Sequence, residues 1–268
     1  MSIPKIEFFG AHYYHTFGFL VLRHFFDPSL IAAEIDQVLR NGPRSSCEVA
    51  RGGEIHFQYV PMMTAETPGS LRLLDRTEIV AASLLGGPVL PTRAKGTRYW
   101  GDTPWHTDSD LPIASLGVVT YSEPLREKSG ALRVLPGSHR AEFRTALRAL
   151  GAVGQPAEKL PAHVLETEPG DVIMFDEHLF HASSGGGTRQ QWRVDYIRDP
   201  TSPEEKEQAE AYWRELYRPD WDGGYDVDRY PSYGSDWRNS GRPSVKRLEA
   251  LGVYELAAQQ EAFTRSRR

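Results

Sequence analysis

Apolar residues recur at helical spacing in five parts of the chain. In the clearest of them, Asp27 and Pro28 suit the N-cap and first turn of a helix, and apolar residues then follow at helical intervals as far as Gly42. Four more helices are predicted at 78–85, 141–150, 202–217 and 245–263. The chain is therefore expected to carry helices toward both ends and one helix among its strands.

Between residues 88 and 198 the pattern changes to short apolar runs separated by glycine and proline. The runs are RYW, SLGVVTY, GALRVLPGS, DVIMF and RQQWRVDYI. Repeated short strands with turn signals between them predict a β-sandwich or barrel. A similar run at 18–22 predicts one more buried strand ahead of the first helix. We therefore expect a mainly β core with flanking helices, an α+β arrangement.

A single domain of 268 residues accommodates these elements in three parts. Residues 1–87 are expected to pack on the core, residues 88–198 to form it, and residues 199–268 to supply C-terminal helices and an aromatic-rich loop. The stretches 52–70 and 222–240 look irregular and are expected to shape the pocket. For the aromatic residues of the second stretch, packing within the loop is favoured over a substrate lid or dimer contact.

Composition excludes several classes of protein. With 31 basic and 36 acidic side chains the net charge is −5, which gives no general attraction to nucleic acid or to an anionic membrane. No stretch reaches the roughly 18 apolar residues of a membrane span, and MSIPKIEFFG lacks the order of a secretion signal. A soluble cytoplasmic monomer or homodimer that binds a small molecule is expected. The lone Cys47 cannot build a thiolate cluster, so any metal must be bound by nitrogen and oxygen.

Candidate metal ligands begin with the stretch PWHTD at 104–108. Residues i and i+2 of an extended segment point to the same side, so His106 and Asp108 can share a site. Two imidazoles and one carboxylate suit an iron(II) ion that must also bind O2, so a distant strand must supply another histidine. His178 and His181, in GDVIMFDEHLFHASSGGG, are the two candidates. They point to opposite faces of a regular strand, and spacing alone does not choose between them.

Arg193 lies in QQWRVDYI, a predicted buried strand in which a charge is costly unless it is paired. A protein carboxylate can supply the partner, or the side chain can face solvent from an alternating strand. A third interpretation is a carboxylate of a co-substrate that chelates the metal, because arginine binds such groups in a bidentate manner.

Five elements together resemble the phytanoyl-CoA dioxygenase family of iron(II)/2-oxoglutarate oxygenases. They are WHTD at 105–108, SGALRVLPGSH at 129–139, PGDVIMF at 169–175, His181 and Arg193. The resemblance covers the segment 88–198, and the N-terminal GFLVLRHFFDPSLI is similar to the opening of that family. It implies a double-stranded β-helix core, the jelly roll also found in cupins, and an enzyme that uses Fe(II), 2-oxoglutarate and O2.

Position by position, the resemblance makes His106, Asp108 and His181 the iron ligands. In that family the distal histidine lies ten residues beyond the aspartate of a Gly-Asp turn, which is Asp171 here. His178 is then a structural residue or a neighbour of the ligands.

The resemblance also assigns a co-substrate site. Arg193 corresponds to the arginine that binds the far carboxylate of 2-oxoglutarate, and Ser183 lies where a hydroxyl often assists it. Lys95 and Tyr99 lie where the family often contacts co-substrate or substrate. The interval between the distal histidine and Arg193 is slightly long for the family, and glycines 185–187 are expected to absorb the extra residue.

The activity implied is hydroxylation of an unactivated C–H bond of a small metabolite, with release of succinate and CO2. Asp108 favours this, because halogenases of the broader class have Gly or Ala at the matching position. The family also acts on secondary metabolites, and this sequence does not select one substrate. Arg229, Arg238 and Arg242 favour a polar or anionic compound.

Two other classes of function are compatible with these residues. A metal-dependent enzyme of the cupin type would not need Arg193 to bind 2-oxoglutarate. A non-catalytic relative would bind a ligand in the barrel and would require the set of metal ligands to be broken or unoccupied, whereas all three positions are intact here.

Overall fold

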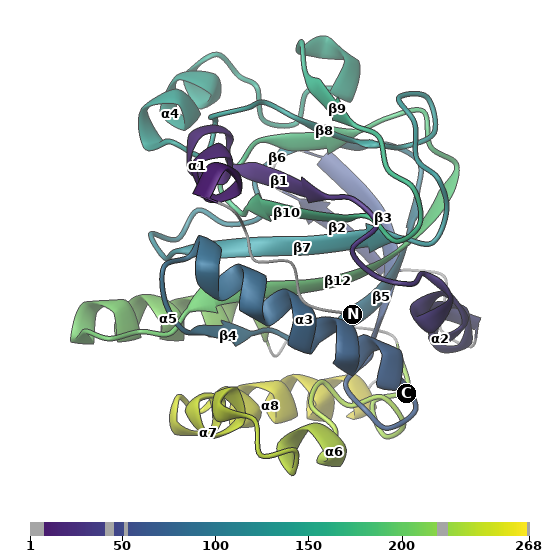
Figure 1. Cartoon of the computed structure of the whole chain (residues 1–268), viewed down its shortest axis with the longest axis vertical. Helices are drawn as coiled ribbons and strands as arrows, with labels where there is room; N and C mark the ends of the chain where they lie inside the picture. The colour runs from purple at the N-terminus through teal and green to yellow at the C-terminus, as the bar shows by residue number, and fades with distance from the viewer. Residues whose placement is uncertain (1–7, 41–45, 51–52, 219–224, 267–268) are drawn as a thin grey trace.

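The computed structural model describes residues 8–40, 46–50, 53–218 and 225–266, and two antiparallel sheets form its centre (Figure 1). The larger sheet contains, in spatial order, β1 (Phe19–Leu22), β10 (Val172–Asp176), β7 (Ser115–Tyr121), β12 (Thr188–Arg198), β5 (Lys95–Trp100), β3 (Gly53–Pro61) and β2 (Ser46–Ala50), and β4 (Val89–Pro91) also pairs with β12. The smaller sheet contains β6 (Thr103–His106), β11 (His181–Ser183), β8 (Leu132–Val134) and β9 (His163–Leu165). Among the described strands none pairs across the two sheets, so they are not closed into a barrel. The expected mainly β, jelly-roll core is confirmed.

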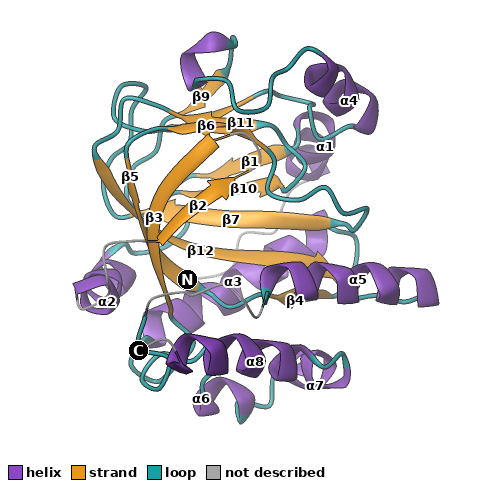
Figure 2. Cartoon of the chain, turned by 180° about the vertical axis from the view of Figure 1, so that it is seen from behind, coloured by secondary structure: helices purple, strands orange, loops and turns teal. Residues whose placement is uncertain are grey.

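The helices flank these sheets, as Figure 2 shows. They are α1 (Phe8–Phe17), α2 (Ser29–Arg40), α3 (Pro68–Leu84), α4 (Ala141–Ala149), α5 (Pro203–Leu216), α6 (Ser235–Arg238), α7 (Pro243–Ala250) and α8 (Val253–Ser266), with a short 3-10 helix at Ala157–Lys159. Helices α6, α7 and α8 gather at the end of the molecule farthest from β8 and β9 (Figure 1). None of the described helices combines the length and the apolar character that crossing a membrane requires.

Helix boundaries follow the local sequence where a cap is present. Helix α5 begins after Ser202, whose hydroxyl accepts a hydrogen bond from the Glu205 N–H, and it matches the prediction at 202–217 closely. The helix predicted at 245–263 is instead two helices, because Gly252 follows α7 in a left-handed conformation with φ +70°.

Two expectations for the N-terminal region are wrong. The helix predicted at 78–85 is only the C-terminal part of α3, which starts at Pro68. The stretch 52–70, expected to be irregular, contains β3 and the first residues of α3, although its first residue lies outside the described part of the chain. Two N–H groups in the first turn of α3 donate to the Glu34 carboxylate on α2, at 2.6 and 2.9 Å. This cap comes from a distant part of the chain, so the local sequence does not reveal it.

The N-terminal region adds strands to the larger sheet. Strand β1 extends one edge, where Phe19 lies opposite Phe175 of β10. Strand β3 continues the sheet beyond β5, where Phe57 lies opposite Tyr99. The proposed division of the chain into three parts stays a prediction.

Strand β12 separates two environments. Trp192 and Tyr196 face α3, where the indole donates to the Ser70 hydroxyl at 2.7 Å and the phenol donates to a backbone carbonyl at 3.0 Å. Because side chains alternate along a strand, Arg189 and Arg193 point to the opposite face, between the two sheets. Both arginine side chains of β12 therefore point into the interior, between the two sheets.

The aromatic-rich stretch packs into the molecule. Tyr225, Tyr230, Tyr233 and Trp237 are buried, while residues 222–224 lie outside the described part of the chain. The Tyr217 hydroxyl donates to that of Tyr233 at 3.0 Å. Packing within an irregular segment, as favoured from the sequence, accounts for these residues.

Candidate metal and co-substrate site

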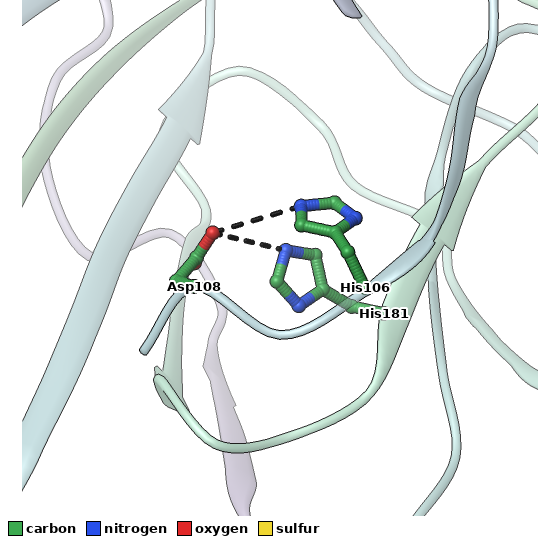
Figure 3. A group of neighbouring side chains, drawn as sticks. All are labelled: His106, Asp108 and His181. Carbon is green, nitrogen blue, oxygen red and sulfur yellow. Dashed lines mark ion pairs between the residues drawn. The ribbon is translucent and has the colours of Figure 1, made fainter. Parts of the chain in front are cut away.

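Two histidines meet because β6 and β11 pair in antiparallel register. His106 ends β6, His181 begins β11, and the two residues lie directly opposite each other. Asp108 lies just beyond β6, where its N–H donates to the Glu177 carbonyl at 2.9 Å. Figure 3 shows the three side chains pointing toward a common centre. The structure therefore brings together the three residues that were predicted from the sequence to be the metal ligands.

Each of the three side chains presents one ligand atom. The Oδ1 atom of Asp108 lies 3.6 Å from Nε2 of His106 and 3.6 Å from Nε2 of His181. In both histidines Nδ1 lies near a backbone carbonyl, 2.7 Å from that of Pro104 and 2.9 Å from that of Leu179. These contacts assign the proton to Nδ1 and leave the lone pair of Nε2 facing Asp108.

The surroundings set the protonation state that metal binding requires. Burial lowers the pKa of His181 to about 4, so its ring is neutral at neutral pH. Burial alone raises the pKa of Asp108, but the positive charge of Arg193 and the contacts with His181 and His106 together outweigh it and hold the pKa well below its ordinary value. A neutral imidazole and an ionised carboxylate are the forms in which these side chains bind metals.

The donor set fits a divalent metal ion. The three ligand atoms lie within 4.8 Å of one another, and ligand bonds to such ions are about 2.1 Å long. Two nitrogens and one oxygen leave other positions open, as an iron(II) site that also binds O2 requires. Within the described ranges this is the one group of three such side chains that could hold a metal.

Arg193 lies between two protein carboxylates. Its Nη2 atom donates to Oδ2 of Asp108 at 2.8 Å, and its Nε atom donates to Oδ1 of Asp195 at 2.7 Å. The other oxygen of Asp195 lies 3.6 Å from Nζ of Lys95. Glu177 is also near, 3.8 Å from Nη2, and burial together with the neighbouring carboxylates raises its pKa to about 8. The charge on Arg193 therefore has partners inside the protein.

A second arginine, Arg189, was missed by the sequence reasoning. It is buried, and its Nη2 atom donates to the hydroxyls of Ser183 at 2.5 Å and Thr103 at 2.9 Å. Its guanidinium lies 5.1 Å from the centre of the Tyr99 ring. The signal was present in the sequence, because residues four apart share a face of a strand and Arg189 precedes Arg193 by four.

A pocket adjoins the candidate metal ligands, with about 480 Å³ of empty space that includes open solvent. It is lined by the ligands themselves, by polar side chains that include Tyr99, Tyr121, Ser183 and Arg189, and by apolar ones such as Val119 and Leu132. Of the predicted co-substrate residues, Ser183, Tyr99 and Arg193 line this pocket and Lys95 does not. No residue of 56–70 or 225–240 lines it either.

The three arginines that favoured an anionic substrate do not line this pocket. Arg229 forms an ion pair with Glu66, and Arg242 forms one with Asp75. Arg238 lies over the ring of Tyr254, 4.6 Å from its centre. These three arginines therefore do not support the expectation of an anionic substrate.

His178 is placed outside the group of ligands. Its Nδ1 lies 2.8 Å from a carboxylate oxygen of Asp176, and its Nε2 lies 2.7 Å from the Leu111 carbonyl. Because both neighbours are acceptors, only the protonated ring satisfies both contacts. His178 thus ties the segment after Asp108 to the turn between β10 and β11.

Comparisons with known proteins agree with this geometry. The profile of the family described as Phytanoyl-CoA dioxygenase (PhyH) matches residues 14–194, more than half of the chain. No curated protein matches the sequence.

HygX, AviO1 and SnoN are three of the solved structures that share the fold. HygX from Streptomyces hygroscopicus, with nickel and 2-oxoglutarate bound, is 18% identical with a TM-score of 0.59, and the match covers 72% of this chain and 88% of HygX. AviO1 from Streptomyces viridochromogenes is 19% identical with a TM-score of 0.55, over 76% of this chain and 99% of AviO1. SnoN, an epimerase solved with Fe3+, alpha ketoglutarate and nogalamycin RO, is 16% identical with a TM-score of 0.55, over 71% and 82% of the two chains.

The His178 contacts predict a pH-dependent stability. Burial lowers the pKa of His178, but the hydrogen bond and charge of Asp176 outweigh it, so the pKa lies above the usual 6.5. A raised pKa contributes stability that is complete below about pH 6.5 and is lost as the pH rises through the folded-state value. His178→Gln is expected to cost about 1–2 kcal/mol of unfolding free energy at about pH 6 and less at about pH 8.5. Urea denaturation of both proteins at the two pH values measures this, and a cost that does not shrink at the higher pH contradicts it.

Proposed function

The chain belongs to the phytanoyl-CoA dioxygenase family of iron(II)/2-oxoglutarate-dependent oxygenases, and from this premise we propose that it oxidises a small molecule at iron(II) bound by His106, Asp108 and His181. The observation that carries the proposal is the convergence of two Nε2 lone pairs and one carboxylate oxygen beside a pocket. When bound, the metal supplies O2 activation coupled to the oxidative decarboxylation of 2-oxoglutarate to succinate and CO2. The protein orients the reactants and limits the access of water.

The pocket offers 2-oxoglutarate a binding site for its far carboxylate. Arg189 is a buried cation, and no carboxylate of the described residues forms an ion pair with it. A buried charge without a partner is costly, and a dicarboxylate ligand removes that cost. The hydroxyls of Ser183 and Thr103, already bonded to the same guanidinium, can donate to the ligand as well. We assign the anchor to Arg189 and Ser183 on these grounds.

The sequence alone favoured Arg193 for this role. Its two carboxylate partners leave its charge compensated, and one of these partners is the candidate metal ligand Asp108. Tyr99 lies beneath the guanidinium of Arg189, and burial raises the pKa of its phenol to about 12, so the phenol stays protonated and can donate a hydrogen bond. Lys95 has Asp195 as its partner and is not assigned to the co-substrate.

Hydroxylation of an unactivated C–H bond is the proposed outcome of the reaction. Asp108 supports it, because its carboxylate takes the ligand position that halogenases of the broader class, with Gly or Ala there, leave to a halide. An isomerisation on the same fold is the alternative outcome, since SnoN carries the name of an epimerase. A polar small molecule is the proposed substrate, in view of the tyrosine, glutamine and arginine side chains that line the pocket.

Metal and co-substrate binding provide the first test. Anaerobic addition of iron(II) and then 2-oxoglutarate to the wild-type protein is expected to produce a weak visible metal-to-ligand charge-transfer band. His181→Ala removes a ligand and is expected to abolish the band, whereas His178→Ala keeps all three ligands and retains it. Stoichiometric iron binding without a band in the wild type would mean that 2-oxoglutarate does not chelate the metal, as in a cupin-type enzyme of another class.

The two arginines are expected to differ in their effect on 2-oxoglutarate. Arg189→Gln removes the unpaired cation of the pocket and is expected to weaken 2-oxoglutarate binding about 100-fold, or about 2.7 kcal/mol. Titration of the charge-transfer band at saturating iron(II) measures the dissociation constant. Arg193→Gln, the matched change four residues along the same strand, is expected to have the smaller effect on this constant. The opposite ranking would return the role of anchor to Arg193.

The product distinguishes hydroxylation from isomerisation. Compounds that stimulate succinate release are found by screening small polar metabolites, and the product is then analysed by mass spectrometry under isotopically labelled O2. We expect one labelled oxygen atom in the product and no turnover by Asp108→Ala. A product with the mass of the substrate contradicts hydroxylation and indicates isomerisation.

A further inference from the structure

We propose that Arg193 is a positioning residue of the metal centre: it occupies Oδ2 of Asp108, so that Oδ1 alone faces the metal, and Asp195 with Lys95 holds it there. The inference rests on the proposed function only in that Asp108 is a metal ligand. Arg193 then has a role different from the binding of 2-oxoglutarate.

The two oxygens of Asp108 have different partners. Oδ1 lies 3.6 Å from the Nε2 atoms of both histidines, where a metal would be shared. Oδ2 accepts a hydrogen bond from Nη2 of Arg193 at 2.8 Å. A carboxylate can bind a metal through one oxygen or through both. A charge-assisted bond on Oδ2 favours binding through Oδ1 alone and leaves more of the metal open to other ligands.

The guanidinium itself is held from its other side. Nε of Arg193 donates to Oδ1 of Asp195 at 2.7 Å, and Oδ2 of Asp195 lies 3.6 Å from Nζ of Lys95. Both oxygens of Asp195 are therefore engaged. The four side chains form an alternating row of acid and base that starts at the candidate metal ligand.

The residues packed around Arg193 leave its guanidinium little room to move. Arg193 lies in the middle of the larger sheet, opposite Val119 of β7 and Lys95 of β5. Its guanidinium lies 5.7 Å from the centre of the Phe175 ring. A Cβ atom on Gly117 would lie 2.9 Å from that ring and 3.4 Å from Nη2 of Arg193, so only glycine leaves room there. The arginine is thus seated by packing as well as by charge.

The same strand therefore carries two arginines with separate partners. Arg193 has two carboxylates of the protein within hydrogen-bond distance, one of them on Asp108. Among the described residues, the hydrogen-bond partners of Arg189 are all neutral oxygens of side chains and backbone. Partners that orient a metal ligand commonly change metal affinity by about 10- to 100-fold when they are removed. Metal affinity, measured without co-substrate, is the quantity that this inference predicts.

Cobalt(II) alone serves as the probe, because its visible absorption reports both affinity and coordination. Arg193→Gln is expected to weaken Co(II) binding about 10- to 100-fold and to change the shape of the spectrum at saturation, since Asp108 is then free to bind through both oxygens. Arg133→Gln is the matched control: Arg133 bonds to the Glu127 carbonyl, does not line the pocket, and is expected to leave the affinity unchanged. Thermal unfolding of each metal-free variant checks that it is folded.

Two milder variants keep the test decisive if Arg193→Gln does not fold. Arg193→Lys keeps the charge but cannot bond to Asp108 and Asp195 together, and it is expected to weaken Co(II) binding about tenfold. Asp195→Asn retains an acceptor for Nε and is expected to have a smaller effect. A folded Arg193→Lys protein with the affinity and spectrum of the wild type overturns the inference.

Failure of the inference can be told apart from failure of the proposed function. If only the inference is wrong, the wild type still forms the charge-transfer band with iron(II) and 2-oxoglutarate. If only the proposed function is wrong, that band is absent while Co(II) binding still depends on Arg193.

Discussion

The antiparallel pairing of β6 with β11 is the constraint on which the site depends. It sets His106 directly opposite His181, although the two lie 75 positions apart in the chain. A shift of one residue in this register would turn one imidazole to the other face of the sheet. The two carbonyls that accept from the Nδ1 atoms belong to residues two positions earlier in each segment. Register and ring orientation are therefore set by the same short pieces of backbone.

Strand β12 places two arginine side chains in the interior, where their charges need partners. Its outer face carries Trp192 and Tyr196 against α3, and its inner face carries two arginines into the space between the sheets. Burying guanidinium groups is unfavourable unless each is paired or hydrogen-bonded. Arg193 bonds to Asp108 and Asp195, while in the described part of the chain Arg189 bonds only to neutral oxygens. This difference in partners is the physical basis for the proposal that Arg193 serves the metal centre and that Arg189 binds the co-substrate.

Two contacts also hold the segment that carries Asp108 in place. The Glu177 carbonyl accepts from the Asp108 N–H, and the His178 ring bonds to the Leu111 carbonyl. Both contacts join the segment after β6 to the turn before β11. The carboxylate thus reaches the histidines from a segment outside the sheet that is nevertheless fixed at two points.

Local patterns determined much of this protein from the sequence alone. Short apolar runs predicted the strands of the core, Ser202 marked the start of α5, and the i, i+2 spacing of His106 and Asp108 placed both on one side of an extended segment. Tertiary structure decided which histidine lies beside that pair, which carboxylates meet Arg193, and how early α3 begins. Each of these depends on a contact between distant segments, such as the Glu34 cap on α3 or the register of β6 with β11. Local sequence carries the periodicity of an element, whereas the partner across the chain is set only when the elements pack.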